Sequence, residues 1–352
     1  MDEARRSETV LVTGGSGFLG GWCVIELLRR GYDVRATIRD PSKESEIRSR
    51  FEPEVDPGDR LTVLAADLTR DDGWQEAVAG CDYVLHVASP FPPSQPKDPD
   101  ELIVPAREGT LRVLGAALDA GAKRVVVTSS VAALRNPADP PDGPITEECW
   151  TDLHNPDLNA YPRSKTIAEM AAWELVRERA EEDRLAVVNP GAILGPVIAN
   201  DLSYSLEVIE RMLKGMPGVP KLGFNFVDVR DVADLEIRAM TDPKAGGERF
   251  IAADRWLWMG EVAAILRERL GERAAKAPTR TVPSFVVRGM ALVDGGLRSI
   301  VGDLGKRVDV TSEKARSTLG WTPMPIEDSI ADTAEALIRH GAAPEPAAAQ
   351  AP

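Results

Sequence analysis

Short runs of apolar residues alternate along the chain with longer segments in which apolar residues recur every three or four positions. The runs are rich in Val, Leu and Ile, and six of them precede residue 191: 9–13, 33–38, 61–65, 83–87, 124–128 and 185–188. Because each run is continuously apolar, we expect strands that are covered on both faces, as helices cover a parallel sheet. The pattern therefore predicts an α/β fold with a doubly wound parallel sheet.

The regular alternation of predicted strands and helices ends after Pro190. Residues 203–214 are typical of a helix, 224–229 of an extended segment and 231–240 of a second helix, with Gly and Pro between them. A ligand at the carboxyl edge of a sheet needs a covering element, so we expect a smaller C-terminal substrate-binding domain here. The predicted boundaries are 8–190 for the sheet domain, with 225–241 returning to it, and 191–224 and 242–335 for the smaller domain. Residues 341–352, rich in Ala and Pro, are predicted to form a flexible tail.

A glycine-rich turn follows the first predicted strand and leads into an apolar-periodic helix. It reads Thr13-Gly14-Gly15-Ser16-Gly17-Phe18-Leu19-Gly20. The first glycine of the motif permits a tight turn, the second lets the backbone approach a pyrophosphate, and the third lets helix and strand pack closely. The helix N-terminus adds free N–H groups and the positive end of its dipole. Glycines also serve plain turn geometry, but the position between a strand and a helix favours a dinucleotide site in a Rossmann-type sheet.

Charged residues end the next two strands. Arg39 stands where a guanidinium would bind the 2′-phosphate of NADP, and Lys43 adds a second positive charge. The alternative is that Arg39 is solvated and Asp40 binds the ribose of NAD. Asp67, followed by Leu68, ends the third strand within reach of an adenine, although an aspartate here is also suited to capping a helix. We therefore predict NADPH/NADP+ as the cofactor, with NAD as the alternative.

A tyrosine and a lysine lie four residues apart at the start of a predicted helix. Tyr161 and Lys165 then share one helix face, a spacing that also occurs on ordinary exposed helices. A free tyrosine titrates near ~10, so a tyrosine that exchanges protons at neutral pH needs a cation that lowers its pKa. The fifth strand ends in Thr128-Ser129-Ser130, at the same sheet edge as the glycine turn. Spacing alone does not separate Ser129 from Ser130 as the partner of a substrate oxygen.

Taken together, these motifs resemble the extended short-chain dehydrogenase/reductases of the NAD-dependent epimerase/dehydratase superfamily. Three segments are similar to the branch of dihydroflavonol reductases, cinnamoyl-CoA reductases and aldehyde/ketone (carbonyl) reductases: 36–41, 86–91 and 161–173. The likeness covers about residues 8–335. It implies NADPH as cofactor and Ser130, Tyr161 and Lys165 as catalytic residues, with Lys165 also holding the nicotinamide ribose.

The resemblance further implies a set of cofactor contacts along the sheet edge. Besides the residues of the glycine turn and the charged strand ends, they are Val87, Ala88, Ser89, Thr128, Pro190, Gly191 and Ile193. Substrate contacts are expected from Phe91, Ser130 and Tyr161. An apolar cavity is expected among Phe91, Pro92, Trp150, Leu153, Met212, Phe224 and Phe226.

Three departures from the branch narrow the expected activity. Leu158-Asn159-Ala160 precedes Tyr161 where cinnamoyl-CoA reductases have an Asn-Trp-Tyr pattern. Residues 134–137 lack the flavonoid-binding pattern, and 104–114 contain no asparagine for a proton relay. The implied function is thus that of a carbonyl reductase, an oxidoreductase that reversibly reduces an aldehyde or ketone to an alcohol with NADPH. A nucleotide-sugar epimerase or dehydratase, a hydroxysteroid dehydrogenase and an NADP-binding redox sensor are the alternatives on the same fold.

Composition excludes several other classes. The 352 residues are 43% hydrophobic and 28% charged, which suffices for a large core, and the formal net charge of -14 disfavours nucleic acid as a partner. No run reaches the ~20 apolar residues of a membrane span. The three cysteines and three histidines are scattered, so we expect no metal, no disulfide framework and a cytoplasmic protein, either a monomer or a homodimer.

Overall fold

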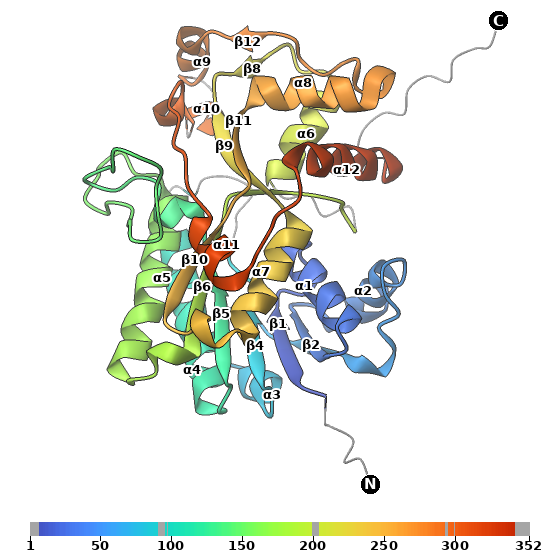
Figure 1. Cartoon of the computed structure of the whole chain (residues 1–352), viewed down its shortest axis with the longest axis vertical. Helices are drawn as coiled ribbons and strands as arrows, with labels where there is room; N and C mark the ends of the chain where they lie inside the picture. Colours follow the sequence, from blue (N-terminus) through green and yellow to red (C-terminus); the bar gives the residue numbers. More distant parts are fainter. Residues whose placement is uncertain are drawn as a thin grey trace, which may run out of the picture.

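A seven-stranded parallel sheet forms the centre of the protein, in the strand order β10-β6-β5-β4-β1-β2-β3 (Figure 1). The structure, a computed structural model, describes residues 7–90, 96, 98–198, 204–292, 295–298 and 300–341. The strands are β1 (Thr9–Thr13), β2 (Asp33–Ile38), β3 (Leu61–Ala65), β4 (Tyr83–His86), β5 (Arg124–Thr128), β6 (Leu185–Pro190) and β10 (Glu248–Ala252). The strand order reverses beside β1, which is where Rossmann-type sheets open a crevice for ligands.

The predicted strands are confirmed, with small differences at two ends. β4 ends one residue earlier than expected, at His86, and β6 continues to Pro190. Alternate residues of a strand point to opposite faces, and in β1 Val10 and Val12 enter one hydrophobic cluster while Leu11 enters another. Both faces of the sheet are therefore buried, as the continuous apolar runs indicate.

Helices cover the two faces of the sheet separately. One cluster joins the sheet to α1 (Phe18–Arg29), α2 (Glu44–Phe51) and α7 (Val229–Thr241). The other joins it to α3 (Trp74–Val78), α4 (Asp100–Asp119) and α5 (Ala160–Glu178). Figure 1 shows α4 and α5 on one side of the sheet and α1 and α7 on the other. No helix in the described part of the chain is long and apolar enough to cross a membrane.

A smaller unit lies beyond one end of the sheet, around its own hydrophobic cluster (Figure 1). Its strands are β7 (Ala192–Leu194), β9 (Gly223–Asp228) and β11 (Arg255–Trp258), in the order β11-β9-β7, and the paired β8 (Val219–Pro220) and β12 (Thr281–Val282). Its principal helices are α6 (Tyr204–Lys214), α8 (Met259–Leu270) and α12 (Ile326–Arg339). Three short helices complete the C-terminal half: α9 (Ser284–Met290), α10 (Gly295–Arg298) and α11 (Glu313–Leu319).

Strand β10 belongs to the large sheet, although its residues were expected in the smaller domain. The sequence assigned 242–335 to the smaller domain, but residues 248–252 pair in parallel with β6, from Glu248 opposite Ala186 to Ala252 opposite Pro190. This strand follows α7 after a short turn, and it was missed because Glu248 and Arg249 leave it without a continuous apolar run. α7, from the segment expected to return to the sheet domain, packs against α1. Of the predicted tail, 341–352, residues 342–352 lie outside the described residues.

A pair of phenylalanines tests whether β10 is part of the large core. Phe250 in β10 is fully buried, whereas Phe285 in α9 is 75% exposed. We expect Phe250→Ala to lower the free energy of unfolding by about 3–5 kcal/mol, because the cavity adds to the lost burial. Phe285→Ala is the matched control, with an expected change within about 0.5 kcal/mol. Urea unfolding measures both, and equal midpoints for the two variants would contradict the placement of β10.

Candidate active site

The carboxyl ends of four adjacent parallel strands carry most of the predicted site. The glycine turn follows β1, residues 87–89 follow β4, Ser129 and Ser130 follow β5, and β6 ends at Pro190. The register aligns these ends, since Thr13 lies opposite His86 and Thr128 opposite Val188. The topology thus brings residues that are far apart in sequence to one edge of the sheet.

The glycine turn is packed so tightly that side chains are excluded. Gly14 has a φ of 69°, and a Cβ there would lie 3.1 Å from the Cβ of Ala88. A Cβ on Gly20 would lie 2.2 Å from the carbonyl oxygen of Gly14, so a side chain at this position would require the backbone of the turn to move. Gly17 forms the N-cap of α1, and none of the described side chains caps this end or places an acidic group in its first turn. Its N–H groups and dipole are therefore available to an anion.

The residues around β2 separate the two predicted cofactor alternatives. Asp40 is engaged in its own turn, where Oδ1 accepts hydrogen bonds from the N–H of Ser42 (3.1 Å) and from its hydroxyl (2.6 Å). Arg39 is exposed and forms no ion pair within the described part of the chain, and Lys43, four residues further on, is exposed at the end of the short helical turn Pro41–Lys43. The free positive charge at this strand end suits a phosphate better than a ribose hydroxyl.

Asp67 stabilises the turn after β3 and does not cap a helix, since the N-cap of α3 is Gly73. Its Oδ1 accepts hydrogen bonds from the N–H and the hydroxyl of Thr69, each 2.8 Å long, so its side chain stabilises the turn after β3. These bonds, chiefly the backbone one, lower the pKa of Asp67, and the nearby charge of Arg39 acts in the same direction. Leu68 packs against Gly109 of α4. Asp67 therefore stays ionised at the end of β3.

Ser130, Tyr161 and Lys165 meet at the end of β5. Ser130 caps a short helical turn, since its Oγ accepts a hydrogen bond from the N–H of Ala132 (3.1 Å). A side-chain hydrogen bond links Ser130 to Tyr161, which lies in the first turn of α5. One turn further, the ammonium of Lys165 donates to the carbonyl oxygen of Thr128 (3.4 Å). Burial lowers the pKa of Lys165 to about 8.

The expected effect of Lys165 on Tyr161 is not seen. Lys165 is directed to Thr128, and the pKa of Tyr161 is raised, because burial of the phenol outweighs its hydrogen bond with Ser130. The spacing of four residues placed both side chains on one helix face correctly, but burial could not be judged from spacing. Tyr161 is consequently protonated at neutral pH.

A buried network lies behind these three residues and separates Ser129 from Ser130. The Ser129 hydroxyl donates to Oε2 of Glu169 (2.5 Å), and the amide of Asn189 donates to the same oxygen (2.8 Å). Arg249 of β10 pairs with the other oxygen of Glu169, with Nε 2.5 Å away. The hydroxyl of Ser129 is thus committed to the interior, whereas that of Ser130 faces Tyr161.

His86 and Thr13 form a second buried contact beneath the glycine turn. Burial lowers the pKa of His86 to about 3, so the ring is neutral. The Thr13 hydroxyl lies 2.9 Å from its Nδ1 and accepts a hydrogen bond from the N–H of Ala88 (3.0 Å). The hydroxyl of Thr13 thereby links His86 at the end of β4 to Ala88 and holds Ala88 against the glycine turn.

Glu236 of α7 is a buried carboxyl group beside the site that the sequence analysis missed. The residue is fully buried, and its Oε1 accepts a hydrogen bond from the hydroxyl of Thr128 (2.6 Å). Burial raises its pKa to about 8. A signal was present, because Glu236 lies on the apolar face of α7 with Val232, Ala233 and Met240. An acidic residue on a buried helix face is costly unless it has a specific role.

The remaining predicted cofactor residues lie at the junction of the two units. A Cβ on Gly191 would lie 2.2 Å from the carbonyl oxygen of Asn225, so only glycine fits between β6 and β9. Gly191 donates its N–H to Ala252 of β10 (2.9 Å), and the carbonyl of Ile193 accepts from Ser205 (2.6 Å). The chain thus crosses from the sheet to the smaller unit along a fixed path.

A small apolar cavity of about 40 Å³ opens in the smaller unit, close to this junction. Its lining includes Met212, Phe224 and Phe226, together with Ala192, Ser205, Val208, Ile209, Met259 and Val262. Of the other expected lining residues, Trp150 instead stacks on Arg249, with its ring centroid 3.7 Å from the guanidinium carbon. Leu153 is not part of the lining, and Phe91 and Pro92 lie outside the described residues.

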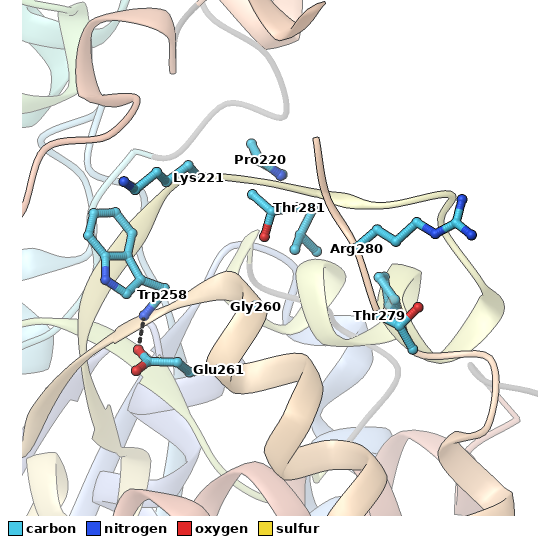
Figure 2. Close-up of a pocket in the computed structure, with 10 residues that line it drawn as sticks. Pro220, Lys221, Trp258, Gly260, Glu261, Thr279, Arg280 and Thr281 are labelled. Carbon is cyan, nitrogen blue, oxygen red and sulfur yellow. Dashed lines mark hydrogen bonds between the residues drawn. The ribbon is translucent and has the colours of Figure 1, made fainter. Parts of the chain in front are cut away.

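A larger hollow of about 480 Å³ lies between β8, β12 and the start of α8 (Figure 2). None of the predicted site residues lines it. Figure 2 shows Lys221 beside the ring of Trp258, and its ammonium lies 5.6 Å from the ring centroid. Glu261 accepts a hydrogen bond from the N–H of Trp258 (2.8 Å), so a carboxylate already occupies this helix end. The hollow therefore lacks the convergent groups found at the sheet edge.

Comparisons with known proteins agree with this geometry. The family model described as "NAD dependent epimerase/dehydratase family" matches residues 10–253. The chain is 35% identical to cinnamoyl-CoA reductase CAD2 of Medicago truncatula over 346 residues, covering 96% of this chain and 98% of the relative. It is 36% identical to a putative anthocyanidin reductase of Ginkgo biloba over 320 residues, covering 83% and 90% of the two chains.

A solved structure shares the whole fold. The yeast methylglyoxal/isovaleraldehyde reductase Gre2, complexed with NADPH, superposes with a TM-score of 0.79 at 26% identity, covering 95% of this chain and 99% of its own. The match extends over the sheet and the smaller unit alike. The chain therefore belongs to the NAD-dependent epimerase/dehydratase family, the extended short-chain dehydrogenase/reductases, and within it to the branch of reductases, as an NAD(P)-dependent oxidoreductase.

Proposed function

We propose that the protein reduces an apolar aldehyde or ketone to an alcohol, with NADPH as the reductant. The observation that carries the proposal is the hydrogen bond between Ser130 and Tyr161 at the sheet edge, with Lys165 one helical turn away. A protonated phenol held by a serine hydroxyl is suited to donate a proton to a carbonyl oxygen. The named activities of the reductase relatives support the same class of reaction.

The residues present fit NADPH. Gly14 and Gly20 keep the turn compact, and Gly17, which has no side chain, lets a pyrophosphate approach the uncapped N-terminus of α1. Arg39 and Lys43 would hold the 2′-phosphate, and Asp67 would lie beside the adenine. The segments 87–89 and 190–193 would flank the nicotinamide end, where Lys165 would hold the ribose. NADPH bound there supplies the hydride that reaches the carbonyl carbon.

The chain itself supplies orientation and the proton. Ser130 donates a hydrogen bond to the carbonyl oxygen and fixes its position relative to the phenol of Tyr161. As the carbonyl carbon gains a hydride, its oxygen becomes negative and takes the proton of Tyr161, which leaves a phenolate. Lys165 does not lower the pKa of the resting phenol, so we propose that its ammonium acts on Tyr161 only once the phenolate has formed. Because burial raises the pKa of Tyr161, its resting form is the proton donor that reduction requires.

The small cavity indicates the kind of substrate. Its walls expose no polar surface, and the rings of Phe224 and Phe226 form an edge-to-face pair with centroids 5.9 Å apart. At about 40 Å³ the cavity is little larger than one water molecule, so its apolar lining favours an apolar group over a sugar nucleotide but admits that group only when the side chains around it repack. The test is NADPH consumption with a panel of aromatic aldehydes, α-ketoesters, diketones and a UDP-sugar. Consumption of NADPH with apolar carbonyls would support the proposal. Binding of NADPH without its consumption with any of these compounds would contradict it.

Tyr161→Phe removes the proton donor while keeping the ring. We expect turnover to fall by a factor of about 10²–10⁴, because general acid catalysis is lost, with the affinity for NADPH unchanged. Steady-state NADPH consumption and NADPH fluorescence titration measure the two effects. Tyr83→Phe is the matched control, since Tyr83 begins β4 at the opposite edge of the sheet. Turnover of the Tyr161 variant near the unmodified rate would exclude this role.

Arg39→Ala tests the choice of cofactor. We expect the dissociation constant of NADPH to rise about 10- to 100-fold, as for the loss of a hydrogen bond to a charged group, and that of NADH to stay nearly constant. Arg107→Ala is the control, because Arg107 lies on α4 and pairs with its neighbour Glu108. Equal losses for NADPH and NADH in the Arg39 variant would argue against recognition of the 2′-phosphate.

A further inference from the structure

Glu236 is a carboxyl group whose charge no cation balances directly. It is fully buried on α7 and forms no ion pair among the described residues. Its Oε1 accepts the 2.6 Å hydrogen bond from Thr128, and its Oε2 has no hydrogen-bond partner in the described part of the chain. A buried polar oxygen without a partner costs free energy, so this arrangement needs an explanation.

Thr128 connects Glu236 to the proposed active site. Its hydroxyl binds Glu236 on one side, while its carbonyl oxygen accepts the hydrogen bond from the ammonium of Lys165. Glu236 therefore fixes the residue against which Lys165 is held. The two side chains come from different helices, α7 and α5, and meet at the last residue of β5.

The second buried carboxylate near Lys165, that of Glu169, already has an ion-pair partner. Glu169 lies one turn further along α5 and pairs with Arg249, 2.5 Å away, while Ser129 and Asn189 donate to its other oxygen. Its negative charge is therefore compensated from β10. Glu169 still raises the pKa of Lys165, and more than Glu236 does, but its charge is fixed by Arg249, whereas the charge of Glu236 changes with pH because burial raises its pKa.

Few other titratable groups face Glu236 from the elements around it. Cys23 of α1 does, and burial together with Glu236 and Glu26 raises the pKa of its thiol, which stays neutral. His86 of β4 lies near Lys165 and is neutral because burial lowers its pKa. On the outer side of α7, Asp234 pairs with Arg238 and with Arg30 of α1.

We infer that Glu236 is a positioning residue, which holds Lys165 in place through Thr128 and supplies the negative charge that keeps the ammonium protonated in alkaline solution. This inference rests on the proposed function, because it assigns Glu236 a part in the same reaction. It deepens that function by giving the site a built-in control over its working pH range.

The pKa values support the sign of this effect. Burial raises the pKa of Glu236 and lowers that of Lys165, in each case to about 8. The two groups interact, so they titrate as a pair. Below this range Glu236 is neutral and Lys165 charged. As the pH rises, Glu236 becomes negative and thereby opposes loss of the proton from Lys165, which extends activity to higher pH.

Glu236→Gln is the direct test, since glutamine keeps the oxygen that accepts from Thr128 but cannot ionise. We expect turnover close to the unmodified rate below about pH 7, and an alkaline decline that begins about one pH unit earlier, because an opposite charge is lost. A variant that is slower by one constant factor at every pH, or whose alkaline limb is unmoved, would overturn the inference.

Two further variants separate this role from a fold defect. Thr128→Val removes the hydroxyl that lowers the pKa of Glu236, so Glu236 ionises later and the alkaline limb shifts in the same direction. Glu147→Gln is the matched control: this carboxyl is also buried and accepts from the N–H of Ile251, but it does not act on Lys165. The inference would be contradicted if the alkaline decline in turnover began at the same pH in Thr128→Val as in the unmodified protein. It would also be contradicted if Glu147→Gln moved that decline as far as Glu236→Gln does.

The pKa of Lys165 can also be measured directly, without any turnover of substrate. NMR of ¹³Cε-labelled lysine in the full-length protein follows the titration of Lys165, whose signal is assigned by its loss in Lys165→Met. We expect the pKa of Lys165 to be about one unit lower in Glu236→Gln. An unchanged pKa refutes the inference even if carbonyls are reduced. Failure of the proposed function is recognised separately, as the absence of Tyr161-dependent NADPH consumption.

Discussion

The buried ion pair between Glu169 and Arg249 fixes the helix that carries the proposed chemistry. Arg249 also donates to the carbonyl oxygens of Glu147 (2.6 Å) and Cys149 (3.0 Å), and its guanidinium stacks on Trp150. One guanidinium thereby joins β10, α5 and the loop before α5. Removing either partner would leave a buried, unpaired charge, which is far more costly than the pair itself is favourable. The orientation of Tyr161 and Lys165 toward β5 depends on this contact.

The two buried carboxylates near Lys165, those of Glu169 and Glu236, have different functions because their surroundings differ. Glu169 is surrounded by donors and contributes a fixed anchor, whereas Glu236 has one donor and a raised pKa, and so remains able to titrate. Burial likewise governs Tyr161, which it holds in the protonated form. The electrostatics of the site are therefore set mainly by exclusion of water, with hydrogen bonds correcting the result group by group.

The parts of the structure that could be predicted are those with local signals. Continuous apolar runs located six strands, and the glycine spacing and the Tyr-Lys spacing located the sheet edge. β10 could not be found, because two of its five residues, Glu248 and Arg249, are charged and leave no continuous apolar run. The Glu169–Arg249 contact joins residues 80 positions apart, and the difference between Ser129 and Ser130 depends on that contact. Burial of Tyr161, which reverses the expected direction of its pKa shift, is likewise a property of the assembled fold.

The separation of the apolar cavity from the proton donor has an evolutionary consequence. Ser130, Tyr161 and Lys165 belong to the large sheet and α5, whereas Met212, Phe224 and Phe226 belong to the smaller unit. Selection can therefore enlarge, shrink or reshape the cavity without disturbing the atoms that move the proton. Gly191 connects the two parts, and a larger side chain there would collide with the carbonyl oxygen of Asn225. New substrates can thus be acquired by a lineage that keeps its chemistry unchanged.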